Sequence, residues 1–285
     1  MPFLTRAYYG ARPACRRFVE NIVELSEPHN LHSSQQTLPD GAKTIRSKQV
    51  CFDNCSTGRS SVICQPRRGY RRLRDAIDGY LRTSRAVRCA AEQIVVTSGI
   101  QQALDLLARL LLKKSDPIWM EDPGYFGTRI AFDNVGAKMI AVPVNEERLS
   151  VSAGIQICPD AKGAYVTPAH QFPLGVTMSL ERRMAVLSWA SRAGAFVIED
   201  DYDSEYRFEG PPVPALQSLD NHSSGIFIGS FSKTLFPALR VGYVVLPAPL
   251  VDLFLGFRYR TDFCNSSFDQ AVLCDFIVDG HLARI

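Results

Sequence analysis

The chain has 285 residues, with 32 basic and 29 acidic side chains and a formal net charge of +3. Such a balance favours neither strong nucleic-acid binding nor attraction to a membrane surface by the chain as a whole. Hydrophobic residues make up 46% of the sequence, which excludes a mostly disordered chain, a collagen and a coiled coil. No apolar stretch reaches about 18 residues and the first residues do not read as a signal peptide, so we expect a cytoplasmic protein without membrane segments.

Residues 1–64 differ in kind from the rest of the chain. One short helical stretch at 16–25 is followed by a polar run without a sustained period of 3.6 or 2, so we expect an irregular or partly disordered segment. This segment also holds Cys51 and Cys55, the one closely spaced pair among eight cysteines. No second close pair or nearby histidine completes a zinc site, so the pattern indicates free thiols in a reducing compartment.

Residues 65–285 form the second predicted unit, in which helical and β-rich segments alternate. Apolar residues recur at helical spacing in 70–81, 101–113, 128–135, 180–191, 250–259 and 268–278. Ser179 is a suitable N-cap and Gly194 a suitable end for the fourth of these helices. Strands are predicted at 93–97, 117–120, 138–144, 164–167, 195–198, 226–228 and 241–246. The alternation predicts an α/β protein with a mixed, mainly parallel sheet.

Eight arginines lie between Arg67 and Arg88, against only Asp75 and Asp78. A nucleic-acid contact is one interpretation of this basic stretch. A solvated helix face or a subunit contact is favoured, because no aromatic residues are interleaved with the arginines.

Familiar nucleotide and hydrolase motifs are absent. No G-x-G-x-x-G follows a strand, and neither G-x-x-x-x-G-K-[ST] nor G-x-S-x-G occurs. Dinucleotide, nucleoside-triphosphate and α/β-hydrolase interpretations are therefore disfavoured.

Chemically useful side chains follow two of the predicted strands, 195–198 and 226–228. In open α/β sheets, ligands bind beyond the carboxyl ends of the strands. The side chains there are a carboxylate, a phenol, hydroxyls, a lysine and an arginine: Asp200, Tyr202, Ser230, Ser232, Lys233 and Arg240.

Pyridoxal phosphate needs this set of groups. A lysine forms the Schiff base, a carboxylate keeps the pyridine nitrogen protonated, a phenol can bind the ring oxygen, and hydroxyls with an arginine hold the phosphate. The main alternative is a carboxylate metal site formed by Glu199, Asp200, Asp201 and Asp203. That alternative leaves Lys233 unexplained.

Six segments occur in the order found in one known family: 69–74, 95–105, 121–125, 167–175, 199–205 and 230–240. They resemble the fold-type I, class I/II aminotransferases, and more closely the aminotransferase-like domain of MocR-type regulators of the GntR family. The resemblance implies the large domain of a fold-type I pyridoxal-phosphate-dependent transferase, with helices on both faces of its sheet.

The resemblance also implies roles for single residues. Lys233 would form the Schiff base, Asp200 would pair with the pyridine nitrogen, Tyr202 would contact the ring oxygen and Tyr125 would stack on the ring. The phosphate would be lined by Gly99, Gln101, Ser230, Ser232 and Arg240. The N-terminus of the helix that starts near Gln101 would add free N–H groups for this anion.

The sequence departs from the family in several places. The family usually has Ser where Ile100 stands and Thr where Ser230 stands, so we expect somewhat weaker phosphate binding. Residues 1–64 match neither the winged helix of the regulators nor the start of the aminotransferase domain, and no DNA-binding segment is found there. The family continues beyond Ile285 into a small domain, so a truncated member without that domain is expected.

Three functions remain open at this point. They are a working aminotransferase that transaminates an amino acid, an effector-sensing domain of a regulator with little turnover, and an inactive remnant. The expected small-molecule partner is an amino acid or amine. The resemblance further implies a homodimer with active sites at the subunit interface.

Overall fold

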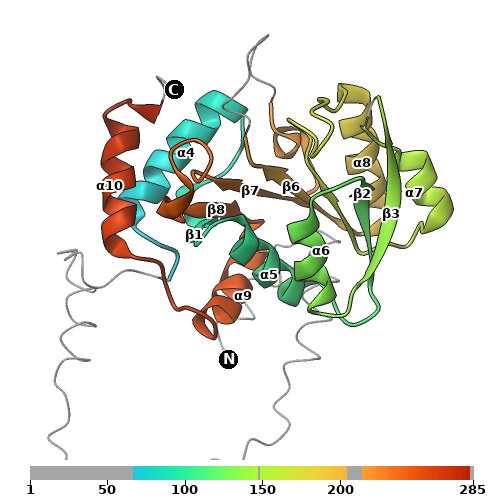
Figure 1. The fold of residues 1–285 in the computed structure, drawn as a ribbon, viewed down its shortest axis with the longest axis horizontal. Helices are drawn as coiled ribbons and strands as arrows, with labels where there is room; N and C mark the ends of the chain where they lie inside the picture. Colours follow the sequence, from blue (N-terminus) through green and yellow to red (C-terminus); the bar gives the residue numbers. More distant parts are fainter. Residues whose placement is uncertain (1–66, 147, 204–213, 283–285) are drawn as a thin grey trace, which may run out of the picture.

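The computed structural model describes residues 67–146, 148–203 and 214–282 (Figure 1). The predicted segment 1–64 lies outside these residues. Within the described part, no helix combines the length and the apolar character needed to cross a membrane.

One eight-stranded sheet runs through the described residues, in the order β1-β8-β7-β6-β5-β2-β3-β4 (Figure 1). The strands are β1 (Ile94–Thr97), β2 (Pro117–Asp122), β3 (Lys138–Asn145), β4 (Arg148–Leu149), β5 (Gly163–Val166), β6 (Phe196–Asp201), β7 (Gly225–Ser230) and β8 (Gly242–Val245). Strands β3, β2, β5, β6 and β7 pair in parallel. Strand β8 is antiparallel to both of its neighbours, β1 and β7, and β4 is antiparallel to β3. The predicted mixed, mainly parallel sheet is confirmed.

Helices cover both faces of this sheet, as the family resemblance implied. They are α4 (Arg71–Arg85), α5 (Ile100–Leu111), α6 (Phe126–Asp133), α7 (Val151–Ile157), α8 (Leu180–Ala193), α9 (Ala248–Tyr259) and α10 (Ser267–Val278). The buried side chains of α5, α6 and α9 pack on one face. Helices α4 and α10 pack on the opposite face near β1, β8 and β7, and α7 and α8 pack on that face near β2, β3 and β5.

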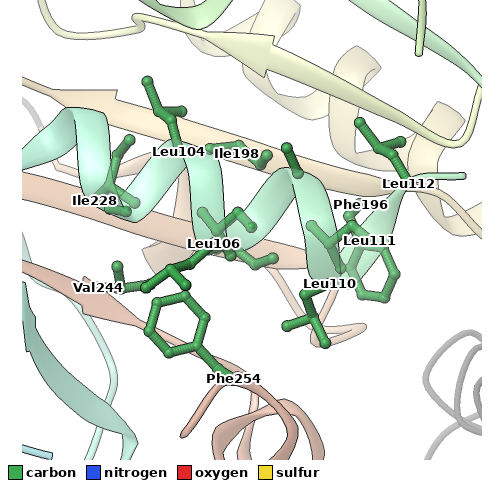
Figure 2. Close-up of a cluster of buried hydrophobic side chains, with 14 of the residues drawn as sticks. Leu104, Leu106, Leu110, Leu111, Leu112, Phe196, Ile198, Ile228, Val244 and Phe254 are labelled. Carbon is green, nitrogen blue, oxygen red and sulfur yellow. The ribbon is translucent and has the colours of Figure 1, made fainter. Parts of the chain in front are cut away.

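The strands divide their side chains between these layers by simple alternation. Ile226 and Ile228 belong to the cluster under α5, whereas Phe227 between them belongs to the cluster under α4 and α10. Figure 2 shows the first cluster, in which leucines of α5 lie against Ile228, Val244 and Phe254. Because both faces are covered, the central strands are buried throughout, and their carboxyl ends are positioned rigidly.

The predicted caps of α8 are confirmed. The Ser179 side chain accepts a hydrogen bond from the backbone N–H of Arg182 at 3.2 Å, and Gly194 ends the helix with a left-handed backbone at φ 65°.

The interpretation of the basic stretch as a solvated face is wrong for two of its arginines. Arg74 and Arg85 are 5% and 4% exposed. Arg74 donates to the backbone oxygens of Gly69 and Ala91, and Arg85 forms a 2.8 Å ion pair with Asp201. Burial of these cations is possible because their donors meet carbonyl or carboxylate oxygens.

Candidate active site

A cavity of about 280 Å³ lies beyond the carboxyl ends of β6 and β7. Its walls are formed by Ile100, Gln101, Tyr125, Phe172, Asp200, Tyr202, Ser230, Ser232, Lys233 and Arg240. The structure therefore brings together every predicted site residue except Gly99, which lies behind Arg240. A larger depression of about 530 Å³ beside Arg82 and Cys89 is open and contains none of the predicted residues.

Asp200 is the buried acid of the cavity, with 2% of its surface exposed near the end of β6. Its Oδ2 accepts a hydrogen bond of 2.5 Å from the hydroxyl of Tyr165 on β5. Its Oδ1 is buried and has no hydrogen-bond partner among the described residues. Burial raises the pKa of Asp200 to about 7; the Tyr165 hydrogen bond opposes this shift, and the nearby carboxylates of Asp201 and Asp203 add to it.

The other acidic residues of this segment turn away from Asp200. Asp201 forms the ion pair with Arg85, and Asp203 lies 2.8 Å from Nδ1 of His170. Glu199 accepts hydrogen bonds from the backbone N–H groups of Leu216 and Gln217 at 2.8 and 2.9 Å. Glu199 and Asp201 flank Asp200 in β6, and successive residues of a strand point to opposite faces, so these two side chains point to the face opposite Asp200. In the described residues no group of three or more ligating side chains is placed to hold a metal ion, so the four-carboxylate alternative is not supported.

Lys233 follows β7 and lies against an aromatic wall. Its Nζ is 4.1 Å from the centre of the Tyr202 ring, a distance typical of a cation–π contact. The ring of Tyr202 stacks on His170, and Phe172 meets both Tyr202 and Tyr125 edge-on at 6.2 and 5.8 Å between ring centres. The Phe172 ring stands nearly perpendicular to the two tyrosine rings, at 81° and 85°, so the wall is aromatic, with the amine of Lys233 beside it.

The opposite end of the cavity is basic and rich in hydrogen-bond donors. Arg240 donates through Nη2 to the backbone oxygen of Ser98 at 2.8 Å. Gly99 has a φ of 102°, and a Cβ atom there would lie only 2.9 Å from Arg240 Nη2, so glycine permits this close approach. The hydroxyl of Ser232 is buried without a hydrogen-bond partner among the described residues. Helix α5 begins at Ile100, and the first N–H groups of a helix have no acceptor within it.

Two residues that contribute to the site, Phe172 and Tyr165, are not among the predicted site residues. Phe172 lies in the segment 167–175 that carries the resemblance, yet its side chain was assigned no role. Tyr165 lies within a predicted strand, and the adjacency of β5 and β6 brings it to Asp200. The sequence signal for Tyr165 is a phenol inside an otherwise apolar strand, because a buried hydroxyl requires a hydrogen-bond partner.

The predicted cofactor fits the chemistry of these residues. Oδ1 of Asp200, which has no hydrogen-bond partner among the described residues, is a buried acceptor that suits a protonated ring nitrogen, and the aromatic side chains of the wall suit a ring. At the other end, Arg240, the free hydroxyl of Ser232 and the start of α5 suit a phosphate dianion. Lys233 is the one lysine among the residues that line the cavity.

Sequence comparisons find related proteins. The model of the family described as aminotransferase class I and II matches residues 20–274. The chain is 45% identical over 215 residues to the probable rhizopine catabolism regulatory protein MocR of Rhizobium meliloti, covering 75% of this chain and 43% of that protein. It is 34% identical over 248 residues to the pyridoxine biosynthesis transcriptional regulator PdxR of Corynebacterium glutamicum, covering 87% and 52%. The chain thus spans about half the length of these relatives, or less.

Solved structures share the fold. Kynurenine aminotransferase of Pyrococcus horikoshii matches with a TM-score of 0.74 and 28% identity, over 83% of this chain and 60% of that one. An archaeal alanine:glyoxylate aminotransferase matches with a TM-score of 0.75 and 27% identity, over 99% and 71%. The predicted fold class is confirmed by these likenesses.

Proposed function

Because the chain belongs to the aminotransferase class I and II family, whose members depend on pyridoxal 5′-phosphate, we propose that its cavity holds this cofactor on Lys233. The substrate or effector class we propose is an amino acid or amine. The observation that carries the proposal is that Lys233, Asp200 and Arg240 all line one cavity, where Oδ1 of Asp200 has no hydrogen-bond partner among the described residues. Residues 65–285 would then form the cofactor-binding large domain.

Each residue would act through the chemistry it carries. Bound pyridoxal phosphate supplies an electron-accepting ring. Asp200 Oδ1 would hold the proton on the ring nitrogen, and Tyr202 would donate to or accept from the ring oxygen. Tyr125 and Phe172 would confine the ring and exclude water from its faces.

Lys233 would have two tasks. Its Nζ would attach the cofactor covalently, and after displacement by an incoming amine it would accept and return the proton at the substrate α-carbon. Its Nζ lies against the ring of Tyr202, and both residues line the cavity. Ser230, Ser232, Arg240, Gly99 and Gln101 would hold the phosphate end.

A second candidate function is effector sensing without appreciable turnover. The identity of 45% to a MocR regulator favours it, because that relative is named for regulation rather than for catalysis. The same cavity would serve both functions. They differ in whether a bound amine is converted or only held.

We further propose a cytoplasmic homodimer. Helix α6 begins directly after the wall residue Tyr125 and leaves Phe126 and Ile130 exposed at 68% and 45%. Large exposed apolar side chains beside a cavity are typical of a contact surface. Sedimentation of the purified chain tests the dimer, and a monomer at micromolar concentration would contradict it.

The test of the cofactor site begins with the visible absorbance of purified protein mixed with pyridoxal phosphate. Borohydride reduction followed by peptide mapping should label Lys233. Lys233→Ala should abolish the label, and Lys138→Ala, which removes an exposed lysine at the start of β3, should not. A label that persists in Lys233→Ala would refute the assignment.

The two candidate functions are separated by a half-reaction assay. Loaded protein is mixed with a panel of amino acids and amines, and formation of pyridoxamine phosphate is measured. Conversion at about 1 per second or faster indicates an aminotransferase. Saturable spectral change without conversion indicates a sensor.

A further inference from the structure

Ser98, the residue before the Gly99 turn, is held at three of its atoms. Its backbone N–H donates to Gln102 Oε1 at 2.7 Å, and its backbone oxygen accepts from Arg240 at 2.8 Å. Its hydroxyl oxygen accepts from Nδ2 of Asn265 at 2.7 Å. A short loop residue tied at this many atoms has little freedom to move.

Two of the partners of Ser98, Gln102 and Asn265, are joined to each other through further side chains into a closed circuit of hydrogen bonds, which we call the Ser98 ring. Gln102 Nε2 donates to Asp262 Oδ2 at 2.6 Å, and Asp262 Oδ1 accepts from Arg258 Nε at 3.3 Å. Arg258 Nη2 donates to the side-chain oxygen of Asn265, which closes the ring at Ser98. The ring joins the start of α5 to the end of α9 and the turn before α10, which lie side by side in Figure 1.

Arg258 gives the ring its rigidity. Its side chain is fully buried, and its remaining donor, Nη1, binds the backbone oxygen of Val96 on β1. Burial lowers the pKa of Arg258, and the adjacent Asp262 opposes that shift. A buried cation is tolerated only while its partners stay in place, so each member of the ring fixes the others.

The ring touches the candidate site at one end only. Ser98 binds Arg240, and Gln102 lies one residue beyond Gln101 of the cavity wall. None of the hydrogen bonds described for the ring reaches Lys233 or Asp200, at the other end of the cavity. A displacement of the Ser98 ring would therefore move the groups proposed to bind the phosphate. It would leave in place the groups proposed to bind the aldehyde and the pyridine nitrogen.

We propose that Gln102, Arg258, Asp262 and Asn265 are positioning residues that set the Ser98–Gly99 turn and Arg240 for the phosphate of the cofactor. The inference rests on the proposed function. It assigns to residues outside the cavity a contribution to recognition of the phosphate, distinct from recognition of the pyridine ring.

The experiment compares the affinities for pyridoxal 5′-phosphate and for pyridoxal, which has the same aldehyde and ring but no phosphate. Asn265→Ala breaks the Ser98 ring of hydrogen bonds at one side, and Gln102→Leu breaks it at the other. Each should weaken binding of pyridoxal phosphate by tenfold or more while leaving the dissociation constant of pyridoxal within about twofold of the parent. Asp252→Asn, an exposed change on the same helix as Arg258, should alter neither value.

The double variant gives an internal check. Both substitutions break the same Ser98 ring. The double variant Gln102→Leu with Asn265→Ala should therefore bind pyridoxal phosphate only slightly more weakly than the weaker-binding single variant. If Asn265→Ala does not fold, Gln102→Leu alone decides, since it leaves the contacts of Arg258 with Asn265 and Val96 intact.

The results that would overturn the inference differ from those that would overturn the function. An equal loss of affinity for both ligands, or no loss of affinity for either, would show that the Ser98 ring does not position the phosphate site. A parent protein that binds neither ligand through Lys233 would refute the proposed function, and the inference with it.

Discussion

The two oxygens of the Asp200 carboxyl have different surroundings. Oδ2 is occupied by the Tyr165 hydroxyl, and Oδ1 is buried and without a hydrogen-bond partner among the described residues. An ionised carboxylate with one free buried oxygen is costly, which is why its pKa is raised to about 7. A protonated ring nitrogen at Oδ1 would remove that cost, so the residue is prepared for a cationic partner.

The pH dependence of stability follows from this pKa. Without cofactor, folded Asp200 keeps a proton up to about pH 7, whereas an aspartate in the unfolded chain loses it near pH 4. The folded state binds more protons between these values, so stability should fall as pH rises from about 4 to 7. In Asp200→Asn this fall should shrink by an amount on the order of a few kcal/mol.

Urea unfolding of the cofactor-free protein at a series of pH values measures this difference. Glu199 is also buried, with its pKa raised to about 7 by burial, and it remains in the variant. Some fall with pH should therefore persist in Asp200→Asn. Parallel curves for parent and variant would show that Asp200 is ionised in the folded state.

Ile100 offers a second prediction at this scale. It is the first residue of α5 and lines the cavity without a hydroxyl. Ile100→Ser should strengthen pyridoxal phosphate binding by about 1.5 to 3 kcal/mol, the value of a hydrogen bond to a charged group. Titration of the visible absorbance measures the change, with Ile155→Ser on α7 as a control. Weaker binding by Ile100→Ser would mean that the apolar side chain itself packs on the cofactor.

Among the elements, β8 and the turn before α5 approach each other most closely at two glycines. A Cβ on Gly242 would lie 2.8 Å from the Cα of Gly99 and 2.9 Å from the backbone oxygen of Gly229. Both contacts are with backbone, which cannot rotate away. Gly242→Ala should therefore push β8 from the turn, lower stability by about 1 to 3 kcal/mol and weaken cofactor binding.

Gly256 provides the matched control for this prediction. It lies exposed on α9, and a Cβ there would meet nothing within 4 Å. Gly256→Ala should raise stability by about 0.5 to 1 kcal/mol, because alanine is the better helix former. Thermal unfolding of both variants measures the contrast, and equal effects of the same sign would contradict the steric argument.

The elements that sequence patterns predicted well are those whose ends carry a local signal. Ser179 and Gly194 bound α8 as expected. Helix α7 was missed because Val151–Ile157 is too short to establish a period and contains Gly154, which faces Trp119. The antiparallel direction of β8 was also not predicted, since strand direction is set by tertiary pairing with β1 and β7.

The same limit applies to the candidate site. Lys233 and Asp200 were predicted because each follows a predicted strand and matches a motif, although β6 in fact continues to Asp201. Tyr165 and the Ser98 ring could not be found in this way, since each depends on which strands and helices become neighbours. Buried Arg85 and Arg258 were equally hidden, because an arginine in an amphipathic helix reads as exposed until its carboxylate partner is placed.

At the scale of the whole molecule, Gln270 joins the first described helix to the last. Its side chain is fully buried on α10, and its Oε1 accepts from the backbone N–H of Tyr70 at the start of α4 at 2.7 Å. Gln270→Leu would remove the acceptor of this partly buried N–H, and an unsatisfied buried donor costs about 1 to 3 kcal/mol. The urea midpoint should fall accordingly.

Val272→Ala on the exposed side of the same helix is the control for Gln270→Leu. It should change stability by no more than about 0.5 kcal/mol. An unchanged midpoint in Gln270→Leu would show that water reaches Tyr70 and that α4 and α10 are held by their apolar contacts alone.

The position of β8 between β1 and β7 has a consequence for how the chain is made. Among the described strands, β1 is the first in sequence, all four of its residues are buried, and β8 is the one described strand that pairs with it, with Thr97 opposite Gly242. A ribosome adds roughly 5 to 20 residues per second, so β8 emerges on the order of ten seconds after β1. Throughout that interval the apolar strand Ile94–Thr97 lacks β8, its partner among the described strands, and a nascent chain released before Gly242 would lack that partner altogether.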